Sequence, residues 1–273
     1  MKINRQAIKK TNKESIKSIP MNQCIAKTYI ENGKKIAGRD VFEHCLIIGN
    51  IAENMLKNFP KDIRDKFFPK GSSLVAACHD IGKISPTFQH KIYKSISQTP
   101  TEIWSIVQDA TLDENKAWGG HAGVSKVTLE HIQAGKFIAE ITGQHHGWSP
   151  KLFGRQAISE QFGGKIWLDQ RISLIQRLKS SLNQDFPKIE NDLQATLIAG
   201  LTTVADWIGS GSLFDNPAED WQPKIQQALD ESGFMAPKIK PNLSFEHIFG
   251  FSPRQVQTHL FELVNQPGVY VLE

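Results

Sequence analysis

The nine histidines are the residues of this sequence best suited to chemistry. One of them forms the pair His79-Asp80 inside an otherwise apolar segment, LVAACHDIG. Burying an imidazole beside a carboxylate is costly unless the two groups are paired or bind a metal ion. The two oxygens of Asp80 can contact two cations at once. The pair therefore predicts a metal site, or else a packed histidine next to a capped aspartate.

Further ionisable side chains lie at the ends or faces of other apolar segments. They are His44, the double histidine His145-His146, Asp206 in LTTVADWIG, and His121 after a Trp-Gly-Gly sequence. Each of them alone is better explained as a packed side chain. Neutral imidazole is the commonest metal ligand in proteins, and carboxylates supply negative charge. Their recurrence in separate segments indicates a shared metal site.

The segments that must position these side chains have mostly helical spacing. Helices are predicted over residues 41–59, 74–83 (with Ser72 or Ser73 as its cap), 121–133, 136–145 and 192–208. Strand candidates are few and short. Residues 149–167 are loop-like and contain the pair Gly163-Gly164. The sequence therefore predicts an all-α helical bundle.

Composition excludes several classes of protein. The chain has 273 residues, of which 40% are hydrophobic and 22% charged, which is typical of a globular protein. No apolar run approaches the roughly 20 residues of a membrane span, and no apolar segment follows the basic N-terminus as in a signal peptide. We expect a cytoplasmic protein with no membrane partner. The three cysteines form no CxxC pair, so we expect reduced, buried thiols.

Positive charge is concentrated in the first 20 residues, which hold six basic residues and one acidic residue. Because the whole chain has a net charge of +4, the remaining residues are close to neutral. The body is therefore not a generally basic nucleic-acid-binding surface. Any contact with DNA would have to use a local groove, metal ions or a partner.

The order His, His-Asp, His, His-His, Asp resembles the HD phosphohydrolase superfamily, an all-helical fold. More narrowly, the sequences ACHDIGKISPTFQHK, TGQHHGW and LTTVADWIGS look like the HD nuclease domain of the CRISPR-associated nuclease–helicases of type I systems. The resemblance covers residues 40–215. It implies an HD-domain helical bundle with a dinuclear metal site.

The resemblance also implies the ligands and the activity. One metal ion would be bound by His44, His79, Asp80 and Asp206, and a second by His121, His145 and His146, with Asp80 bridging the two. The implied enzyme is a metal-dependent deoxyribonuclease that cleaves single-stranded DNA, as endonuclease and exonuclease, in type I CRISPR interference. Its implied partners are the RNA-guided surveillance complex and a helicase domain, in the same or a partner chain.

Five histidines and two aspartates form a ligand set rich in imidazole. Magnesium prefers oxygen ligands, so we expect Mn, Fe, Co or Ni ions to be favoured, with Mg still usable. Lys83 follows Asp80 by one helical turn, and we expect it to stabilise a phosphate or to protonate the leaving oxygen. The weaker candidates for substrate binding are Ser210, Trp148 and His90.

The C-terminal residues differ from the body. SPRQVQTHLFELVNQPGVYVLE resembles the segment that opens the first helicase lobe of that family, and GVYVL predicts a short strand. The sequence contains no GxxxxGK[ST] motif, so we expect no bound nucleotide. We therefore expect a basic segment at 1–40 that packs on or precedes the HD domain, an HD nuclease domain at 41–236, and a linker with the beginning of a helicase domain at 237–273. On this interpretation the rest of the helicase domain is absent from the chain.

Two alternative functions remain open. Other HD enzymes hydrolyse cyclic dinucleotides or nucleotides, and the former share HDIGK and a double histidine. They continue with an acidic residue and Gly-Tyr-Pro, whereas residues 147–150 here are Gly-Trp-Ser-Pro. The other alternative is a docking module without catalysis, in which metal ions only stabilise the fold. Such a structural site is normally closed by protein ligands.

Overall fold

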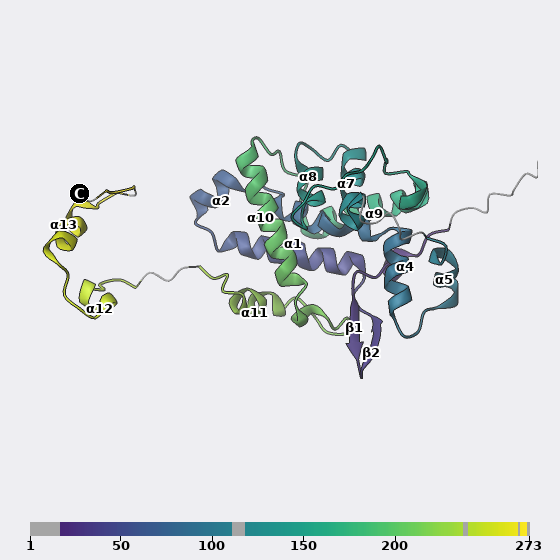
Figure 1. Cartoon of the computed structure of the whole chain (residues 1–273), viewed down its shortest axis with the longest axis horizontal. Coiled ribbons are helices and arrows are strands. Elements are labelled where there is room, and N and C mark those ends of the chain that lie inside the picture. Colours follow the sequence, from purple (N-terminus) through teal and green to yellow (C-terminus); the bar gives the residue numbers. More distant parts are fainter. Residues whose placement is uncertain (1–16, 111–117, 237–239, 267, 272–273) are drawn as a thin grey trace, which may run out of the picture. The chain divides into compact units, whose positions relative to one another are not determined.

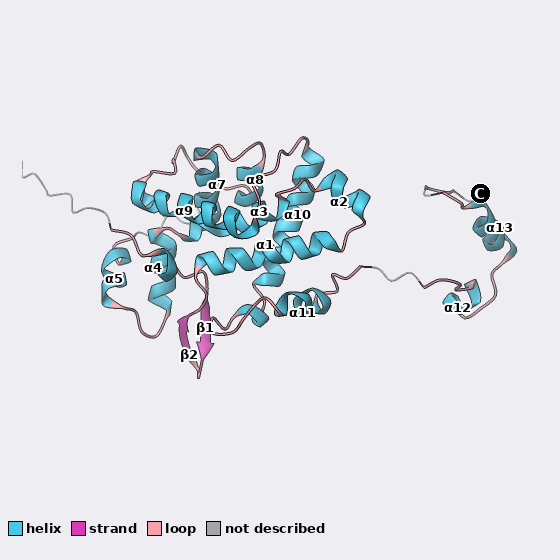
Figure 2. Ribbon diagram, turned by 180° about the vertical axis from the view of Figure 1, so that it is seen from behind, coloured by secondary structure: helices cyan, strands magenta, loops and turns pink. Residues whose placement is uncertain are grey.

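The computed structural model describes residues 17–110, 118–236, 240–266 and 268–271. Helices dominate these residues, which confirms the predicted fold class (Figure 2). The chain divides into two compact units, residues 1–235 and 236–273, which are described separately below. Among the described helices, none combines the length and the hydrophobicity that crossing a membrane would require.

Helix α1 (Val41–Lys57) lies at the centre of the larger unit. The side chain of Asp40 caps its first turn by accepting a hydrogen bond from the Glu43 backbone N–H at 2.8 Å. Its apolar face packs against α3 (Ser72–Ala77) and α10 (Asp192–Gly209), and α10 crosses α1 in Figure 1. These three helices form the core of the unit.

The other described helical elements of this unit surround these three helices. They are η1 (Met21–Gln23), α2 (Lys61–Phe67), η2 (Cys78–Lys83), α4 (Pro86–Ser95), α5 (Thr101–Val107), α7 (Gly120–His131), α8 (Ile138–Gly143), η3 (Glu160–Phe162), α9 (Gly164–Leu182), η4 (Ser212–Phe214) and α11 (Lys224–Glu231). The helix predicted over 136–145 is shorter than expected, because Phe137 has a positive φ of 68° and α8 begins only after it.

The helix predicted over 74–83 changes form after Ala77. α3 ends at Ala77, and Cys78–Lys83 form the 3₁₀ helix η2. A Cβ atom at Gly82 would lie 2.0 Å from the carbonyl oxygen of His121 and 2.6 Å from the backbone nitrogen of Ser125. The glycine therefore allows η2 to rest directly on α7, and this tertiary contact stabilises a conformation that the local pattern does not predict.

The loop predicted over 149–167 ends earlier in the structure, because its last residues belong to a helix. Gly163 and Gly164 both have positive φ angles, of 88° and 64°, and α9 begins at Gly164. Trp167 is therefore a buried helical residue. The two glycines begin a helix and do not lie inside a loop.

A two-stranded hairpin interrupts the otherwise helical fold. β1 (Thr28–Glu31) pairs with β2 (Lys34–Ala37) in antiparallel register, and Asn32 and Gly33 form the turn with positive φ angles of 49° and 74°. Asn-Gly is the preferred sequence for such a turn. The hairpin projects from the helical body in both views (Figures 1 and 2).

The first 16 residues, which carry most of the N-terminal basic charge, lie outside the described part of the chain. Within residues 17–40, several side chains are buried in the main core: Ile19, Cys24, Ile25 and Ala26. This part of the predicted N-terminal segment thus packs as an integral part of the larger unit. The thiols of Cys24, Cys45 and Cys78 are buried and free, as expected.

The smaller unit contains α12 (Phe245–Phe249) and α13 (Gln255–Leu263), and neither helix has a buried residue. Residues 237–239, at the start of the predicted linker, lie outside the described residues. The strand predicted from GVYVL is not formed by the described residues 268–271. Val269 and Val271 are 96% and 82% exposed, and a strand without a neighbouring strand gains no ladder hydrogen bonds.

Candidate metal centre

Five separate segments bring the predicted ligands together. They are the first turn of α1 with His44, η2 with His79 and Asp80, the first turn of α7 with His121, the turn after α8 with His145 and His146, and the last turn of α10 with Asp206. The seven side chains form two groups whose candidate ligand atoms lie within 4.8 Å of one another.

The first group consists of His44, His79, Asp80 and Asp206. The Nε2 atoms of His44 and His79 lie 3.0 Å and 3.1 Å from Asp80 Oδ2. His79 Nε2 also lies 3.3 Å from Asp206 Oδ1. Two imidazoles and two carboxylates thus converge from α1, η2 and α10.

The second group consists of His121, His145 and His146. The Nε2 atoms of His121 and His146 are 2.9 Å apart. His145 is buried, whereas His146 is exposed and the His121 side chain is 19% exposed. This group therefore opens to solvent on one side.

Asp80 faces both groups. Its Oδ2 atom contacts His44 and His79, whereas its Oδ1 atom lies 3.1 Å from His121 Nε2 and 3.5 Å from His145 Nε2. One carboxylate oxygen is directed toward each group, which is the arrangement needed for a bridging ligand.

Buried polar atoms test whether these residues suit metal ions. His79 Nε2, Asp80 Oδ1 and His145 Nε2 are buried and have no hydrogen bond among the described residues. The Nδ1 atoms of His79 and His145 donate to the carbonyl oxygens of Ala76 at 2.8 Å and Thr142 at 2.6 Å. Because a carbonyl only accepts, Nδ1 of each ring keeps its proton, and Nε2 is the atom that remains to bind a metal ion. The donor set fits divalent ions.

The pKa values describe the site without an ion. Burial lowers the pKa of His44 to about 4 and that of His145 to about 3, so both rings are neutral at pH 7. Burial alone would also lower the pKa of His79, but Asp80 and Asp206 outweigh it and raise that pKa to about 10. Burial alone would raise the pKa of Asp80, but His79, Lys83 and His121 hold it well below its usual value.

Two of the predicted accessory residues contact candidate metal ligands. Lys83 Nζ lies 2.6 Å from Asp80 Oδ2, its side chain is 12% exposed, and it lies over the ring of Phe88. The hydroxyl of Ser210 donates to Asp206 Oδ1 at 2.9 Å. Both residues are therefore placed next to carboxylates of the site.

The other two accessory predictions have different surroundings. His90 is buried between α4 and α5, where its Nδ1 donates to the Val107 carbonyl at 2.8 Å and its ring contacts Trp104. These contacts hold His90 in the packing between two helices. Trp148 is 48% exposed and follows the double histidine by two residues, so its ring is accessible to a ligand.

The sequence interpretation assigned no role to Gln89, a fully buried residue of α4. Its amide nitrogen donates to the carbonyl oxygens of Lys83 at 2.9 Å and Ile25 at 3.0 Å, and its oxygen accepts from the Ile25 N–H at 2.9 Å. Gln89 thus fixes the end of η2 to the N-terminal segment. The available signal was a polar residue at a buried helical position, directly after the Pro-Thr-Phe sequence that begins α4.

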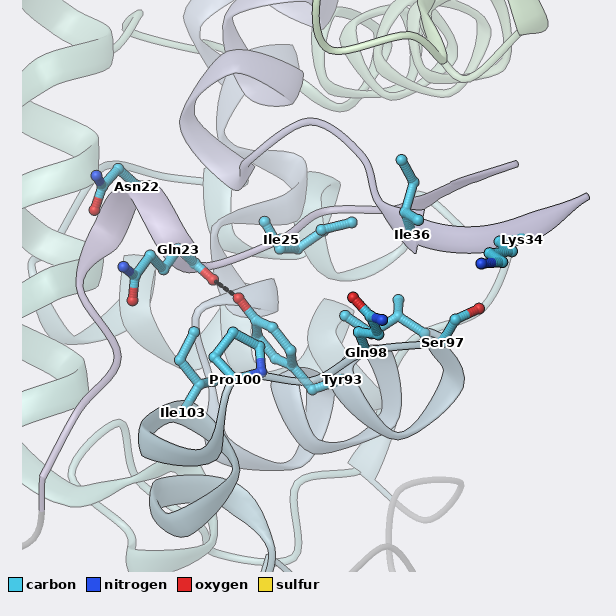
Figure 3. A pocket seen from close by; sticks show the side chains of 12 residues that line it. Asn22, Gln23, Ile25, Lys34, Ile36, Tyr93, Ser97, Gln98, Pro100 and Ile103 are labelled. Atoms are coloured by element: carbon cyan, nitrogen blue, oxygen red, sulfur yellow. Dashed lines mark hydrogen bonds between the residues drawn. The ribbon is translucent and has the colours of Figure 1, made fainter. Parts of the chain in front are cut away.

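A separate cavity of about 410 Å³ lies between the hairpin and the α4–α5 pair (Figure 3). Its apolar walls include Ile36, Ile96 and Ile103, and the Tyr93 hydroxyl at its side donates to the Gln23 carbonyl at 2.6 Å. None of the metal-site residues lines this cavity. The cavity is therefore separate from the histidine–aspartate centre.

Residues 26–214 match the family model of the Cas3 HD domain, and this span contains every member of the two ligand groups. This chain belongs to the Cas3 HD domain family. Membership in that family confirms the resemblance drawn from the motifs and agrees with the all-helical fold.

Among curated proteins, the CRISPR-associated nuclease/helicase Cas3 of Streptococcus thermophilus is 27% identical to this chain over 297 residues. The match covers 90% of this chain and 31% of that protein. The chain therefore spans about a third of its relative's length.

Solved structures show the same fold. A crystal structure of T. fusca Cas3-ADP matches with a TM-score of 0.62 and 20% identity, covering 91% of this chain and 31% of that one. The Thermus thermophilus Cas3 HD domain in the presence of Ni²⁺ matches with a TM-score of 0.50 and 17% identity, and the match covers 78% of this chain and 92% of that one. A chain of a CRISPR RNA-guided surveillance complex in a pre-nicking state matches with a TM-score of 0.53 and 19% identity, and the match covers 79% of this chain and 28% of that one.

Proposed function

We propose that this chain is a metal-dependent nuclease that hydrolyses the phosphodiester bonds of single-stranded DNA in type I CRISPR interference. The placement of Asp80 carries this proposal, because its two oxygens are directed at two separate groups of ligands. Two bound divalent ions would supply an activated water and would neutralise charge on the phosphate.

The residues of the chain have distinct roles in this proposal. His44, His79 and Asp206 would hold one ion, and His121, His145 and His146 the other, with Asp80 shared. The Nδ1 bonds of His79 and His145 orient these two rings before an ion arrives. Lys83 would contribute a positive charge beside the reacting phosphate or a proton to the leaving oxygen.

The ligand chemistry favours transition-metal ions. Over the two groups together, five imidazoles face two carboxylates, and magnesium binds oxygen ligands in preference to nitrogen. We therefore propose that Mn, Fe, Co or Ni ions support more activity than Mg. The exposed His146 and the partly exposed His121 leave the second group accessible, which favours a catalytic site over a closed structural one.

The substrate and partners are proposed from the same features. The exposed ring of Trp148 can stack on an unpaired base, which is a sequence-independent contact. Ser210 is placed to orient Asp206 or to contact a phosphate. Because the relatives are CRISPR-associated and one similar chain belongs to an RNA-guided surveillance complex, we propose that such a complex supplies the single strand. Residues 237–273 would link the nuclease to a helicase domain.

Cleavage of circular single-stranded DNA by metal-stripped protein tests this function. Adding back Mn²⁺, Ni²⁺, Co²⁺ or Mg²⁺ should restore cleavage, with the first three more effective. A circle has no ends, so the assay detects endonuclease activity alone, and a linear strand then tests exonuclease activity. Asp80→Asn should lower the rate at least about 100-fold, because it weakens a ligand of both ions.

Two outcomes would contradict the proposal. Hydrolysis of a cyclic dinucleotide or a nucleotide without DNA cleavage would indicate another HD phosphohydrolase. Binding of two ions without hydrolysis of any of these substrates, also when the helicase part is supplied, would indicate a docking module.

A further inference from the structure

The carboxylate of Glu140, on α8, joins the elements that carry the second ligand group. It accepts hydrogen bonds from Lys126 on α7, from the side-chain amide of Gln144, and from the Ser149 hydroxyl at 2.6 Å. Gln144 and Ser149 lie on either side of the double histidine. One side chain therefore contacts both ends of the histidine turn and the helix that carries His121.

The contact between α7 and α8 is tight where Lys126 crosses it. A Cβ atom at Gly143 would lie 3.0 Å from Cδ and 3.1 Å from Cβ of Lys126, so the aliphatic part of Lys126 lies directly on this glycine. Its Nζ atom then reaches Glu140, one helical turn earlier on α8. The Lys126–Glu140 ion pair thus holds the end of α8 against α7.

We propose that Glu140 is a positioning residue that holds the turn of His145 and His146 against α7 and so sets the geometry of the second metal group. This inference rests on the proposed function in one respect, namely that the second group holds an ion. Glu140 itself has no contact with a ligand side chain among the described hydrogen bonds and acts through Gln144, Ser149 and Lys126.

Two further observations agree with this role. Partial burial alone would raise the pKa of Glu140, but the hydrogen bonds from Lys126, Ser149 and Gln144 outweigh it and lower the pKa, so the carboxylate is charged at pH 7. The first ligand group is carried by α1, η2 and α10, and none of these elements donates a described hydrogen bond to Glu140. A change at Glu140 should therefore affect the two ions unequally.

The test compares Glu140→Ala and Glu140→Gln with Asp169→Ala in the full chain. Asp169 forms an exposed ion pair with Lys165 on α9, so its removal is a matched loss of a surface salt bridge. The Glu140 side chain is 40% exposed, and we expect all three variants to fold and to unfold at the wild-type temperature without metal.

The first measurement needs no metal. The amides of Gln144 and Gly147 donate within the turn, to the carbonyls of Glu140 and Gln144. Hydrogen exchange at these amides should become at least about tenfold faster in metal-free Glu140→Ala, and less so in Glu140→Gln. The Asp169→Ala control should exchange at the wild-type rate. Unchanged exchange in Glu140→Ala would overturn the positioning role.

The second measurement is a Mn²⁺ titration. Glu140→Ala should bind the ion of the first ligand group with wild-type affinity, and the ion of the second group at least about tenfold more weakly. The affinity of Glu140→Gln for the second ion should lie between those of the wild type and Glu140→Ala. Equal weakening of both ions, or of neither, would overturn the proposal for Glu140. Fewer than two ions bound by the wild-type chain would instead contradict the proposed function, and the exchange measurement would still decide the role of Glu140.

Discussion

At the scale of single residues, His79 links metal binding to pH. In the metal-free protein, burial alone would lower its pKa, but the two neighbouring aspartates raise that pKa to about 10. His79 is therefore protonated at pH 7, and an ion can bind its Nε2 atom only when that proton leaves. His44 and His145, whose pKa values burial lowers to about 4 and about 3, are already neutral and release no proton.

The expected result is that Mn²⁺ affinity rises with pH. Since one proton is displaced below the raised pKa, the dissociation constant should fall about tenfold per pH unit between pH 6 and pH 8. Calorimetric titrations in buffers of different ionisation enthalpy should show about one proton released. A dissociation constant that does not change over this range would contradict the assigned protonation of His79.

Lys83 offers a second prediction at this scale. Its ammonium group lies 2.6 Å from Asp80 Oδ2 but cannot itself bind a cation. Lys83→Ala should therefore lower the rate of DNA cleavage by about 100-fold or more while two ions still bind. The exposed Lys91 on α4 provides the matched control, because Lys91→Ala should leave the rate unchanged. Full activity of Lys83→Ala would exclude a catalytic role for this lysine.

At the scale of elements, the closeness of η2 to α7 determines whether Asp80 reaches the second group. A Cβ atom at Gly82 would collide with the His121 carbonyl at 2.0 Å, whereas one at Gly200, inside α10, would meet no atom within 4 Å. Gly82→Ala should lower the free energy of unfolding by about 1–3 kcal/mol and weaken the binding of an ion by the second ligand group. Gly200→Ala should raise that free energy by up to about 1 kcal/mol. Thermal unfolding and Mn²⁺ titration of both variants check this. If Gly82→Ala changed neither the free energy of unfolding nor the Mn²⁺ affinity, the contact between η2 and α7 would not be needed.

The sequence predicts elements whose apolar spacing is regular and misses those set by contacts elsewhere. α1 and α10 follow the helical pattern closely, and the candidate ligand residues near their ends were selected by residue type and motif order. The 3₁₀ form of η2 depends on α7, which lies 40 residues further along the chain. The hairpin was missed although Asn32-Gly33 is a strong local signal for a tight turn.

The same distinction holds at the site. Motif order brought the seven ligand residues into consideration, and their convergence is seen in the structure. The sequence left open whether His79 and Asp80 bind a metal ion or pack as a histidine beside a capped aspartate, and in the structure His79 Nε2 lies 3.1 Å from Asp80 Oδ2. Glu140 and Gln89 were not found, because a supporting hydrogen bond depends on side chains that are distant in sequence or on the exact course of a turn.

At the scale of the whole molecule, the division into two units predicts that the first can function alone in metal binding. Both ligand groups lie within residues 1–235, and the described helices of the second unit bury no residue. A chain that ends at Met235 should unfold within about 2 °C of the full chain and bind two Mn²⁺ ions. Calorimetry checks both properties. A lower unfolding temperature or the loss of an ion would show that residues 236–273 are part of the metal-binding fold.

In the proposed site, Asp80 bridges two metal ions. The most direct test of this bridging is a crystal structure of the Mn²⁺-loaded protein with anomalous scattering recorded at the manganese edge. We expect two peaks about 3.5–4 Å apart, one near each oxygen of Asp80. The first peak should be surrounded by His44, His79 and Asp206, and the second by His121, His145 and His146. A single peak at full loading, or two peaks that do not share Asp80, would contradict the bridging.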